Sequence, residues 1–226
     1  MDSSRDQIMK RVHAALSGTT RAPASPLPPT ARVASRGAGD ADAEIDLLLA
    51  EIAKLGGTTR RVAGRDELQA ALRDLVQAER VKKATMWQAR DLQELGVADA
   101  LGALGVEIVP SDSDKRALAE CDLGVTGADA ALPETGTLVL RASSEHSQAV
   151  SLLPRVHLAI VQPSALRADL HQVLDEVKGD KRVHFVTGPS RTADIEKTLS
   201  IGVHGPKALY VWVCLTFALA QPAQNG

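Results

Sequence analysis

The chain alternates between segments whose apolar residues repeat with a helical period and short runs that are apolar or alternating. Residues 45–55 carry apolar side chains three or four positions apart and stop at Gly56-Gly57, which predicts a helix ended by glycine. The segment 156–161 is a nearly continuous apolar run, as expected for a strand buried on both faces. The same patterns predict helices over 4–16, over 66–76 with Asp66 as its cap, over 92–101 (one broken helix or two short ones) and over 165–177, a helical turn near 117, and strands over 58–63, 83–87, 106–109, 183–187 and 209–215.

Strands and helices in this order predict an α/β fold, with a Rossmann-like three-layer α/β/α arrangement around a mostly parallel sheet. The globular domain is expected over residues 41–226. Residues 17–40 contain several prolines among Ser, Thr and Gly, which is typical of a flexible linker. Residues 1–16 then form an N-terminal helical arm. Its apolar stripe is expected either to swing free or to contact another chain, including a second copy in a homo-oligomer.

Composition excludes several classes of function. The net charge of −2 and the 2% aromatic content argue against a nucleic-acid partner. Cys121 and Cys214 are the only cysteines, too few for a four-cysteine iron–sulfur or zinc site, so no metal or other cofactor is expected in this chain. Two buried thiols and an N-terminus without a signal peptide indicate a cytoplasmic protein. The longest apolar run, near 209–220, is too short to span a membrane.

The stretch over residues 121–141 is predicted as strand, loop and strand, with candidate chemistry in the loop. Its glycines allow unusual backbone angles and the close approach of a ligand or another segment. Its acidic residues, Asp129 and Glu134, lie in the predicted turn at the edge of the sheet. One interpretation is a tight hairpin in which these residues serve turn geometry, and the other is a ligand site. The candidate residues are Thr126, Gly127, Asp129, Thr135 and Gly136 for binding a substrate or anion, and Glu134 as a catalytic nucleophile or general base.

A second candidate site is the loop Gly188-Pro189-Ser190-Arg191-Thr192, between a predicted strand and a predicted helix that begins near residue 193. A helix N-terminus offers unpaired N–H groups and partial positive charge. Gly188 lets a ligand come near, and Arg191 supplies a fork for phosphate or carboxylate. Ser190 and Thr192 add hydroxyl donors. The alternative is structural, with Thr192 as the helix cap and Arg191 paired to an acidic side chain of the helix.

Three histidines carry different expectations. His204 lies between two glycines in a predicted loop and is a candidate for proton transfer. His146 is expected to be a solvated loop residue, and His157 a hydrogen-bonded core residue. Ligands of doubly wound sheets bind outside the carboxyl ends of the strands. The hypothesis is that the loops 126–129 and 188–191 converge there with His204.

Three sequence blocks resemble the lactate-utilisation protein C family, whose members carry a LUD domain. The blocks are 125–129 continuing into Glu134-Thr135-Gly136-Thr137, then LLPRVHLAIV at 152–161, and TGPSRTADIE at 187–196 followed by GVHGP at 202–206. The resemblance implies a fold like that of ribose-phosphate isomerases, glucosamine-phosphate deaminases and CoA transferases. It also implies a part in bacterial oxidation of lactate to pyruvate beside two iron–sulfur partner proteins. It supplies no established catalytic residue for this subunit.

Three functions follow as hypotheses. The first is a non-redox subunit of a lactate-oxidising assembly, because the chain has too few cysteines for a cluster and no recognisable flavin or nicotinamide loop. The second is a stand-alone enzyme of isomerase or CoA-transferase type acting on a small carboxylate or phosphate, with Glu134 as the reacting group and Arg191 as the anion site. The third is a pure scaffold with a vestigial pocket.

Overall fold

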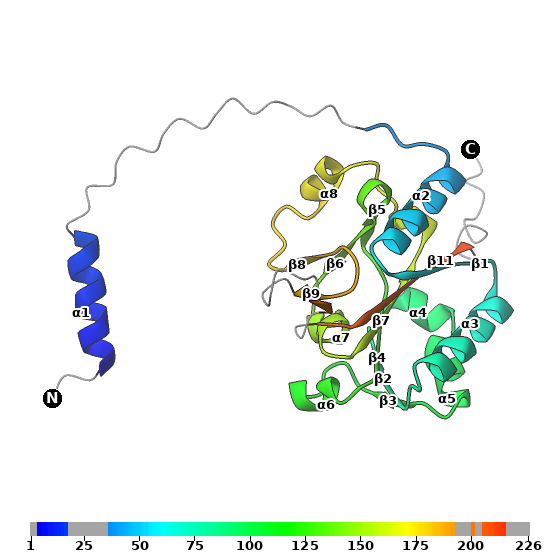
Figure 1. Cartoon of the computed structure of the whole chain (residues 1–226), viewed down its shortest axis with the longest axis horizontal. Coiled ribbons are helices and arrows are strands. Elements are labelled where there is room, and N and C mark those ends of the chain that lie inside the picture. Colours follow the sequence, from blue (N-terminus) through cyan, green and yellow to red (C-terminus); the bar gives the residue numbers. More distant parts are fainter. Residues whose placement is uncertain (1–3, 18–35, 193–199, 202–204, 216–226) are drawn as a thin grey trace. The chain divides into compact units, whose positions relative to one another are not determined.

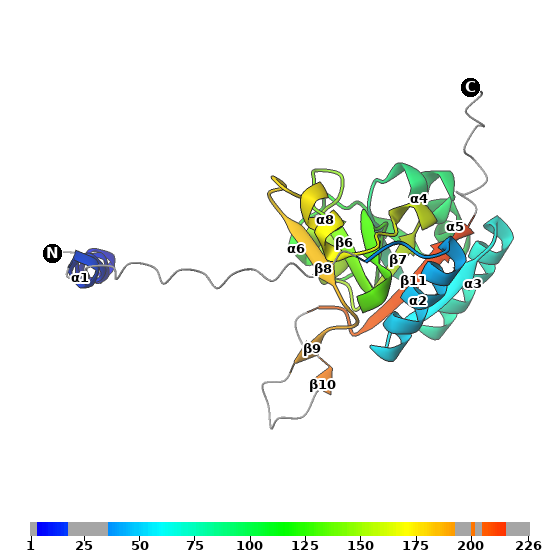
Figure 2. The same ribbon diagram turned by 90° about the horizontal axis from the view of Figure 1, so that it is seen from above.

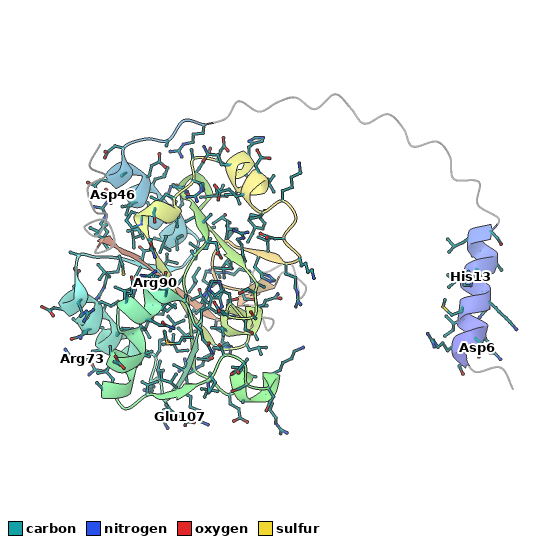
Figure 3. All side chains as sticks on the ribbon, turned by 180° about the vertical axis from the view of Figure 1, so that it is seen from behind. Asp6, His13, Asp46, Arg73, Arg90 and Glu107 are labelled. Carbon is teal, nitrogen blue, oxygen red and sulfur yellow. The ribbon has the colours of Figure 1, made fainter. Side chains whose placement is uncertain are left out.

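The computed structural model describes residues 4–17, 36–192, 200–201 and 205–215. The chain divides into two compact units, Met1–Ala34 and Ser35–Gly226. The first unit contains helix α1 (Ser4–Ser17), which confirms the helix predicted over 4–16 and buries none of its side chains. Asp6 and His13, labelled in Figure 3, lie on α1, and Nδ1 of His13 is 3.0 Å from the carbonyl oxygen of Met9.

The second unit is built on a sheet of six strands that all run parallel. Figure 1 labels these strands. The predicted α/β fold with a parallel sheet is therefore confirmed. Each predicted core strand is present, with bounds shifted by two residues at most. In spatial order the strands are β1 (Thr58–Val62), β11 (Ala208–Cys214), β7 (Val156–Val161), β4 (Leu123–Thr126), β2 (Lys83–Met86) and β3 (Glu107–Val109).

Alternate side chains of the central strands pack into two different layers. Leu123, Val125 and Leu158 belong to a core that includes apolar residues of α3, α4 and α5. Ala159 and Val161 belong to a second core, with apolar residues of α2. The period of two along a strand divides the side chains in this way. The helices of the domain are α2 (Ala41–Lys54), α3 (Arg65–Ala78), α4 (Arg90–Glu94), α5 (Val97–Ala103), α6 (Lys115–Ala119), α7 (Gln148–Leu152), α8 (Leu170–Glu176), and the 3₁₀ turns η1 (Pro133–Thr135) and η2 (Pro163–Ala165).

A smaller antiparallel sheet replaces the hairpin predicted within 121–141. β4 lies in the parallel sheet, whereas β6 (Thr137–Arg141) pairs with β5 (Ala130–Leu132) on one side and β8 (Val183–Val186) on the other. The hairpin is thus β5–β6, and the preceding residues cross from one sheet to the other. Sequence alternation could not show this, because it identifies strands without their partners.

Two helices differ from the prediction in where they begin. The segment expected as one helix over 165–177 is the turn η2 followed by α8, which begins after Asp169, whose carboxylate accepts the N–H of Gln172 at 3.1 Å. Helix α3 begins after Gly64, so Asp66 lies in its first turn and is not the cap. For residues 92–101 the prediction left open one broken helix or two short ones, and the structure has the two short helices α4 and α5.

The loop predicted over 188–192 ends in a short strand. β9 (Arg191–Thr192) pairs antiparallel with β10 (Ser200–Ile201), and together they form the ribbon visible in Figure 2. Arg191 and Thr192 therefore have extended backbone. The predicted helix start over 193–196 lies outside the described residues.

The domain also takes in the end of the predicted linker. Arg36 donates hydrogen bonds to both carboxylate oxygens of Glu44, at 2.6 and 3.0 Å, and its backbone N–H donates to Asp169. These contacts tie residue 36 to α2 and to the start of α8. Within the described ranges, no helix is both long and apolar enough to cross a bilayer.

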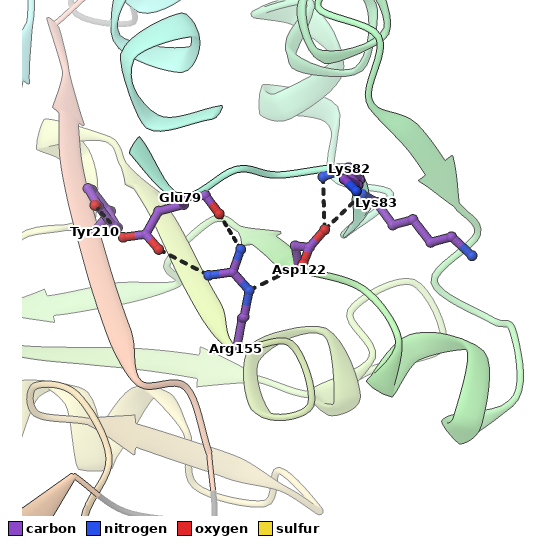
Figure 4. A network of polar contacts seen from close by, with 6 residues as sticks. All are labelled: Glu79, Lys82, Lys83, Asp122, Arg155 and Tyr210. Carbon is purple, nitrogen blue, oxygen red and sulfur yellow. Dashed lines mark hydrogen bonds and ion pairs between the residues drawn. The ribbon is translucent and has the colours of Figure 1, made fainter. Parts of the chain in front are cut away.

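An ion network closes the edge of the parallel sheet where the central strands begin (Figure 4). Arg155 donates to Asp122 at 3.2 Å and to the Glu79 carboxylate at 3.1 Å, and also to the Glu79 carbonyl. Tyr210 donates to Glu79 at 2.8 Å. Asp122 also accepts the N–H of Lys82 at 2.8 Å. Every carboxylate in this network has several donors, so the network holds β2, β4, β7 and β11 together.

Candidate functional site

The order of the strands marks one position at the opposite edge of the sheet. After β2 the chain adds β3 on one side, and it then returns to place β4 on the other side of β2. The carboxyl ends of β2 and β4 therefore flank the point where the strand order reverses. Open α/β sheets bind ligands in the crevice at such a point.

A cavity of about 380 Å³ lies at this carboxyl edge. Asp91 is held there by two hydrogen bonds: one oxygen accepts the N–H of Leu92 at 2.9 Å, and the other accepts Gln162 Nε2 at 3.1 Å. Gly127 packs against the same carboxylate, and a β-carbon at this position would lie 3.3 Å from Asp91 Oδ2. The cavity is lined by Gln88, Ala89, Arg90, Asp91, Glu94, Glu145, His146 and Gln162.

The loop 143–147 forms one wall of this cavity. The ring of His146 stacks on Trp87 with 4.3 Å between centroids and 8° between planes. Trp87 Nε1 donates to the carbonyl of Ser147 at 3.0 Å, and the N–H of Gln88 donates to the carbonyl of Glu145 at 3.3 Å. His146 lies in a loop, as predicted, and is half-buried because its ring stacks on Trp87. The polar sequence around His146 did not indicate this aromatic partner, which lies 59 positions earlier in the chain.

The charge at this edge is negative. Arg90 is the one cation in the lining and pairs with Glu94 at 2.7 Å, which leaves Asp91 and Glu145. Burial, with Asp91 contributing, raises the pKa of the nearby Cys214 thiol to about 12, so the thiol stays protonated. Such a lining favours hydroxyl, amide or cationic groups of a ligand over a free anion.

Thr126 is the last residue of β4, and its side chain is buried, so it is not exposed to a ligand at this edge. Its hydroxyl is 2.8 Å from His157 Nε2, and both side chains are buried. Burial lowers the pKa of His157 to about 4, so the ring is neutral near pH 7. The predicted core role of His157 is confirmed. Asp129 accepts the N–H of Arg141 at 2.7 Å, which fits the turn-geometry interpretation of that residue.

Glu134, Thr135 and Gly136 form the turn η1 and its end, and this turn packs along α2. Gly136 has φ 61°, and a β-carbon there would lie 2.8 Å from the backbone nitrogen of Ile52, so only glycine fits. Glu134 is exposed. It adds to the effect of Glu44 in raising the pKa of Arg36, which places its charge near the start of the domain. The hydroxyl oxygen of Thr137 is 2.8 Å from that of Thr135 and 2.8 Å from that of Thr187.

The 188–191 loop lies at the amino edge of the sheet. The N–H of Ser190 donates to the carbonyl of Pro206, shortly before β11, at 3.0 Å. Arg191 donates to the carbonyl of Leu55, shortly before β1, at 3.3 Å. A cavity of about 190 Å³ is lined there by Gly188, Ser190 and other residues, including His157, Thr187, Gly205 and Pro206.

The structure therefore does not bring the predicted site residues to one edge. Gly127 is at the carboxyl edge, whereas Gly188, Ser190 and Arg191 are at the amino edge beside the end of α2. His204 and the side chain of Thr192 lie outside the described residues. Sequence analysis missed Asp91 and Gln162. Their position just after strands β2 and β7 was the available signal, because parallel strands end at the same edge.

The fold and this edge define a Rossmann-like α/β protein with a polar crevice at the strand-order reversal. The LUD domain matches residues 45–213, and the chain belongs to the LUD-domain family. It is 34% identical over 158 residues to lactate utilization protein C of Shouchella clausii, covering 65% of this chain and 69% of that protein. It is 30% identical over 182 residues to lactate utilization protein C 1 of Bacillus mycoides, covering 74% of this chain and 78% of that protein.

A solved structure confirms the fold independently. The crystal structure of a DUF162 family protein from Deinococcus radiodurans superposes with a TM-score of 0.58 at 19% identity, covering 78% of this chain and 99% of that one. At this identity the likeness speaks for the fold alone.

Proposed function

We propose that this chain is a non-redox subunit of an L-lactate utilisation assembly that oxidises lactate to pyruvate together with iron–sulfur partner proteins. The likeness to lactate utilization protein C of Shouchella clausii and to lactate utilization protein C 1 of Bacillus mycoides supports the lactate part of the proposal. The placement of the two thiols supports the non-redox part. Cys121 precedes β4 at the amino edge, and Cys214 ends β11 at the carboxyl edge. Both are buried, and burial raises the pKa of each thiol. Two protonated thiols on opposite edges of a sheet cannot ligate one cluster.

Lactate oxidation removes two electrons, and ordinary side chains do not accept them. The proposal therefore assigns electron transfer to the partners and assembly to this chain. Helix α1 supports the assembly role, because Ile8, Val12 and Leu16 are 61%, 45% and 66% exposed. An apolar stripe of this kind is typical of a helix that docks on another protein.

The test is reconstitution with the two iron–sulfur proteins of the lactate-utilisation system from the same organism. The isolated chain should contain no stoichiometric iron or flavin and should not oxidise L-lactate. Adding it to the partners should restore lactate-dependent dye reduction. A variant with Ile8, Val12 and Leu16 changed to Ser should bind the partners more weakly, whereas the control Asp6→Ser should not. Lactate oxidation by the isolated chain would overturn the proposal.

The roles predicted for Glu134 and Arg191 belong to the stand-alone enzyme and need a separate test. Arg191 contacts the carbonyl of Leu55 at the end of α2, and the turn that carries Glu134 packs along the same helix, with Gly136 against Ile52. The subunit proposal predicts that Glu134→Gln leaves reconstituted lactate oxidation within about twofold of wild type. Loss of turnover with an unchanged melting temperature would favour the enzyme.

A further inference from the structure

A second, larger cavity lies on the other side of the 143–147 loop from the carboxyl-edge cavity. It measures about 670 Å³, within the usual size of about 300–1,000 Å³ for small-molecule sites. We call it the basic cleft. It is lined by Lys115, Ala142, Ser143, Ser144, Ser147, Gln148, Ala149, Leu152, Leu153, Lys181 and Arg182.

The lining contains three cations and no carboxylate. Lys115 begins α6, and Lys181 and Arg182 precede β8. Within the described part of the chain, none of the three forms an ion pair. The acids next to them in sequence are already engaged: Asp114 accepts the N–H groups of Arg116 and Ala117 at 2.8 and 3.1 Å, and Asp180 pairs with Arg141 at 2.6 Å.

The cations project from fixed backbone. The carbonyl of Arg182 accepts the N–H of Ala142 at 3.1 Å, which ties the two sides of the cleft together at the end of the small sheet. Gln148 is 3.1 Å from Nδ1 of His184. Ser143 Oγ accepts the N–H groups of Glu145 and His146 at 3.2 and 3.0 Å, so its own hydroxyl hydrogen is available to an acceptor in the cleft.

We propose that the basic cleft binds a small polyvalent anion, a metabolite with two or more carboxylates or a phosphate group. Three like charges around one cavity repel one another, and a ligand with several negative charges relieves that repulsion better than a monoanion. The hydroxyl donors suit the same oxygen acceptors. The site is separate from any lactate chemistry, so it holds or fails independently of the proposed subunit function.

The test is calorimetric titration of the full chain at constant ionic strength with pyrophosphate, citrate and lactate. We expect saturable binding of pyrophosphate or citrate, and the stronger of the two identifies the phosphate or carboxylate class. Lactate should bind about tenfold more weakly or worse, a difference of about 1.4 kcal/mol. The double variant Lys181→Gln/Arg182→Gln should weaken the polyvalent anion by about tenfold or more.

The matched control is Arg73→Gln/Lys82→Gln, which removes two exposed cations outside the cleft and should leave the affinity unchanged. Hydrogen exchange on the wild-type chain gives a readout that needs no variant, and the ligand should protect residues 143–149 and 181–182. Equal weakening in both double variants, equal affinity for lactate, no saturable binding, or protection elsewhere would each overturn the proposal.

Discussion

The amino and carboxyl edges of the parallel sheet both carry charged side chains, but these side chains are paired with one another at the amino edge and face a cavity at the carboxyl edge. At the amino edge, Arg155, Glu79 and Asp122 satisfy one another and the backbone around them. At the carboxyl edge, Asp91 is fixed by Gln162 but still faces a cavity of about 380 Å³. The comparison shows that a cluster of charges is not by itself evidence of a site. Charges that match one another hold strands together, and charges that face an open cavity can meet a ligand.

The largest expected effect on stability comes from the interior between the two edges, where His157 is buried and neutral. Its pKa is 6.5 when exposed and about 4 in the fold. The unfolded chain therefore binds a proton that the folded chain does not, and stability falls as the pH drops from 6.5 towards 4. We expect a loss of about 2–3 kcal/mol between pH 7 and 4.5 from this residue. Urea denaturation of wild type and His157→Gln at both pH values measures it, since the variant should lack this part of the pH dependence. Parallel curves would mean that water reaches the ring.

The amino edge should give the next largest effect. Arg155→Met removes the donor shared by Glu79 and Asp122, and the partly exposed network should lose about 2 kcal/mol of unfolding free energy. For a chain of this size that corresponds to a melting temperature lower by roughly 4–8 °C. Calorimetry measures it against Arg73→Met, an exposed cation on α3. If both variants melt at the same temperature, the network does not hold the strands.

The carboxyl edge should respond in function more than in stability. Asp91→Asn keeps an oxygen for the N–H of Leu92 and leaves a neutral amide beside Gln162, so unfolding free energy should change by less than about 1 kcal/mol. If this crevice serves the assembly, reconstituted lactate oxidation should fall by about tenfold, or 1.4 kcal/mol. Asp74→Asn, which changes an exposed carboxylate on α3, is the control. Full turnover in Asp91→Asn would show that the carboxyl edge, like the amino edge, has only a structural role.

The smallest expected effect is that of Gly127→Ala. The added β-carbon would lie 3.3 Å from Asp91 Oδ2, so the carboxylate must shift by a few tenths of an ångström. We expect a cost below about 1 kcal/mol. By contrast, Gly136→Ala places its β-carbon 2.8 Å from backbone and should cost more. Thermal unfolding of both variants ranks their losses of stability. A larger loss in Gly127→Ala would show that the turn along α2 accommodates a β-carbon more easily than the carboxyl edge does.

The sequence by itself determined the core strands and most helices, because burial on one or both faces imposes a period that is visible along the chain. Val156–Val161 and Ala41–Lys54 are examples. It also identified the LUD likeness, and it predicted the core role of His157. These properties are local, or they depend on residue type and spacing alone.

Only the tertiary structure decided which strands pair and which loops share an edge. Thr126 and Thr137, close in sequence, belong to different sheets, while His146 finds Trp87 and Arg191 finds Leu55 across long separations. The period of a strand does not name its neighbour, so the candidate residues could be found along the chain but not placed together. For the same reason the polar crevice around Asp91 and the basic cleft around Lys181 emerged only once the chain was folded.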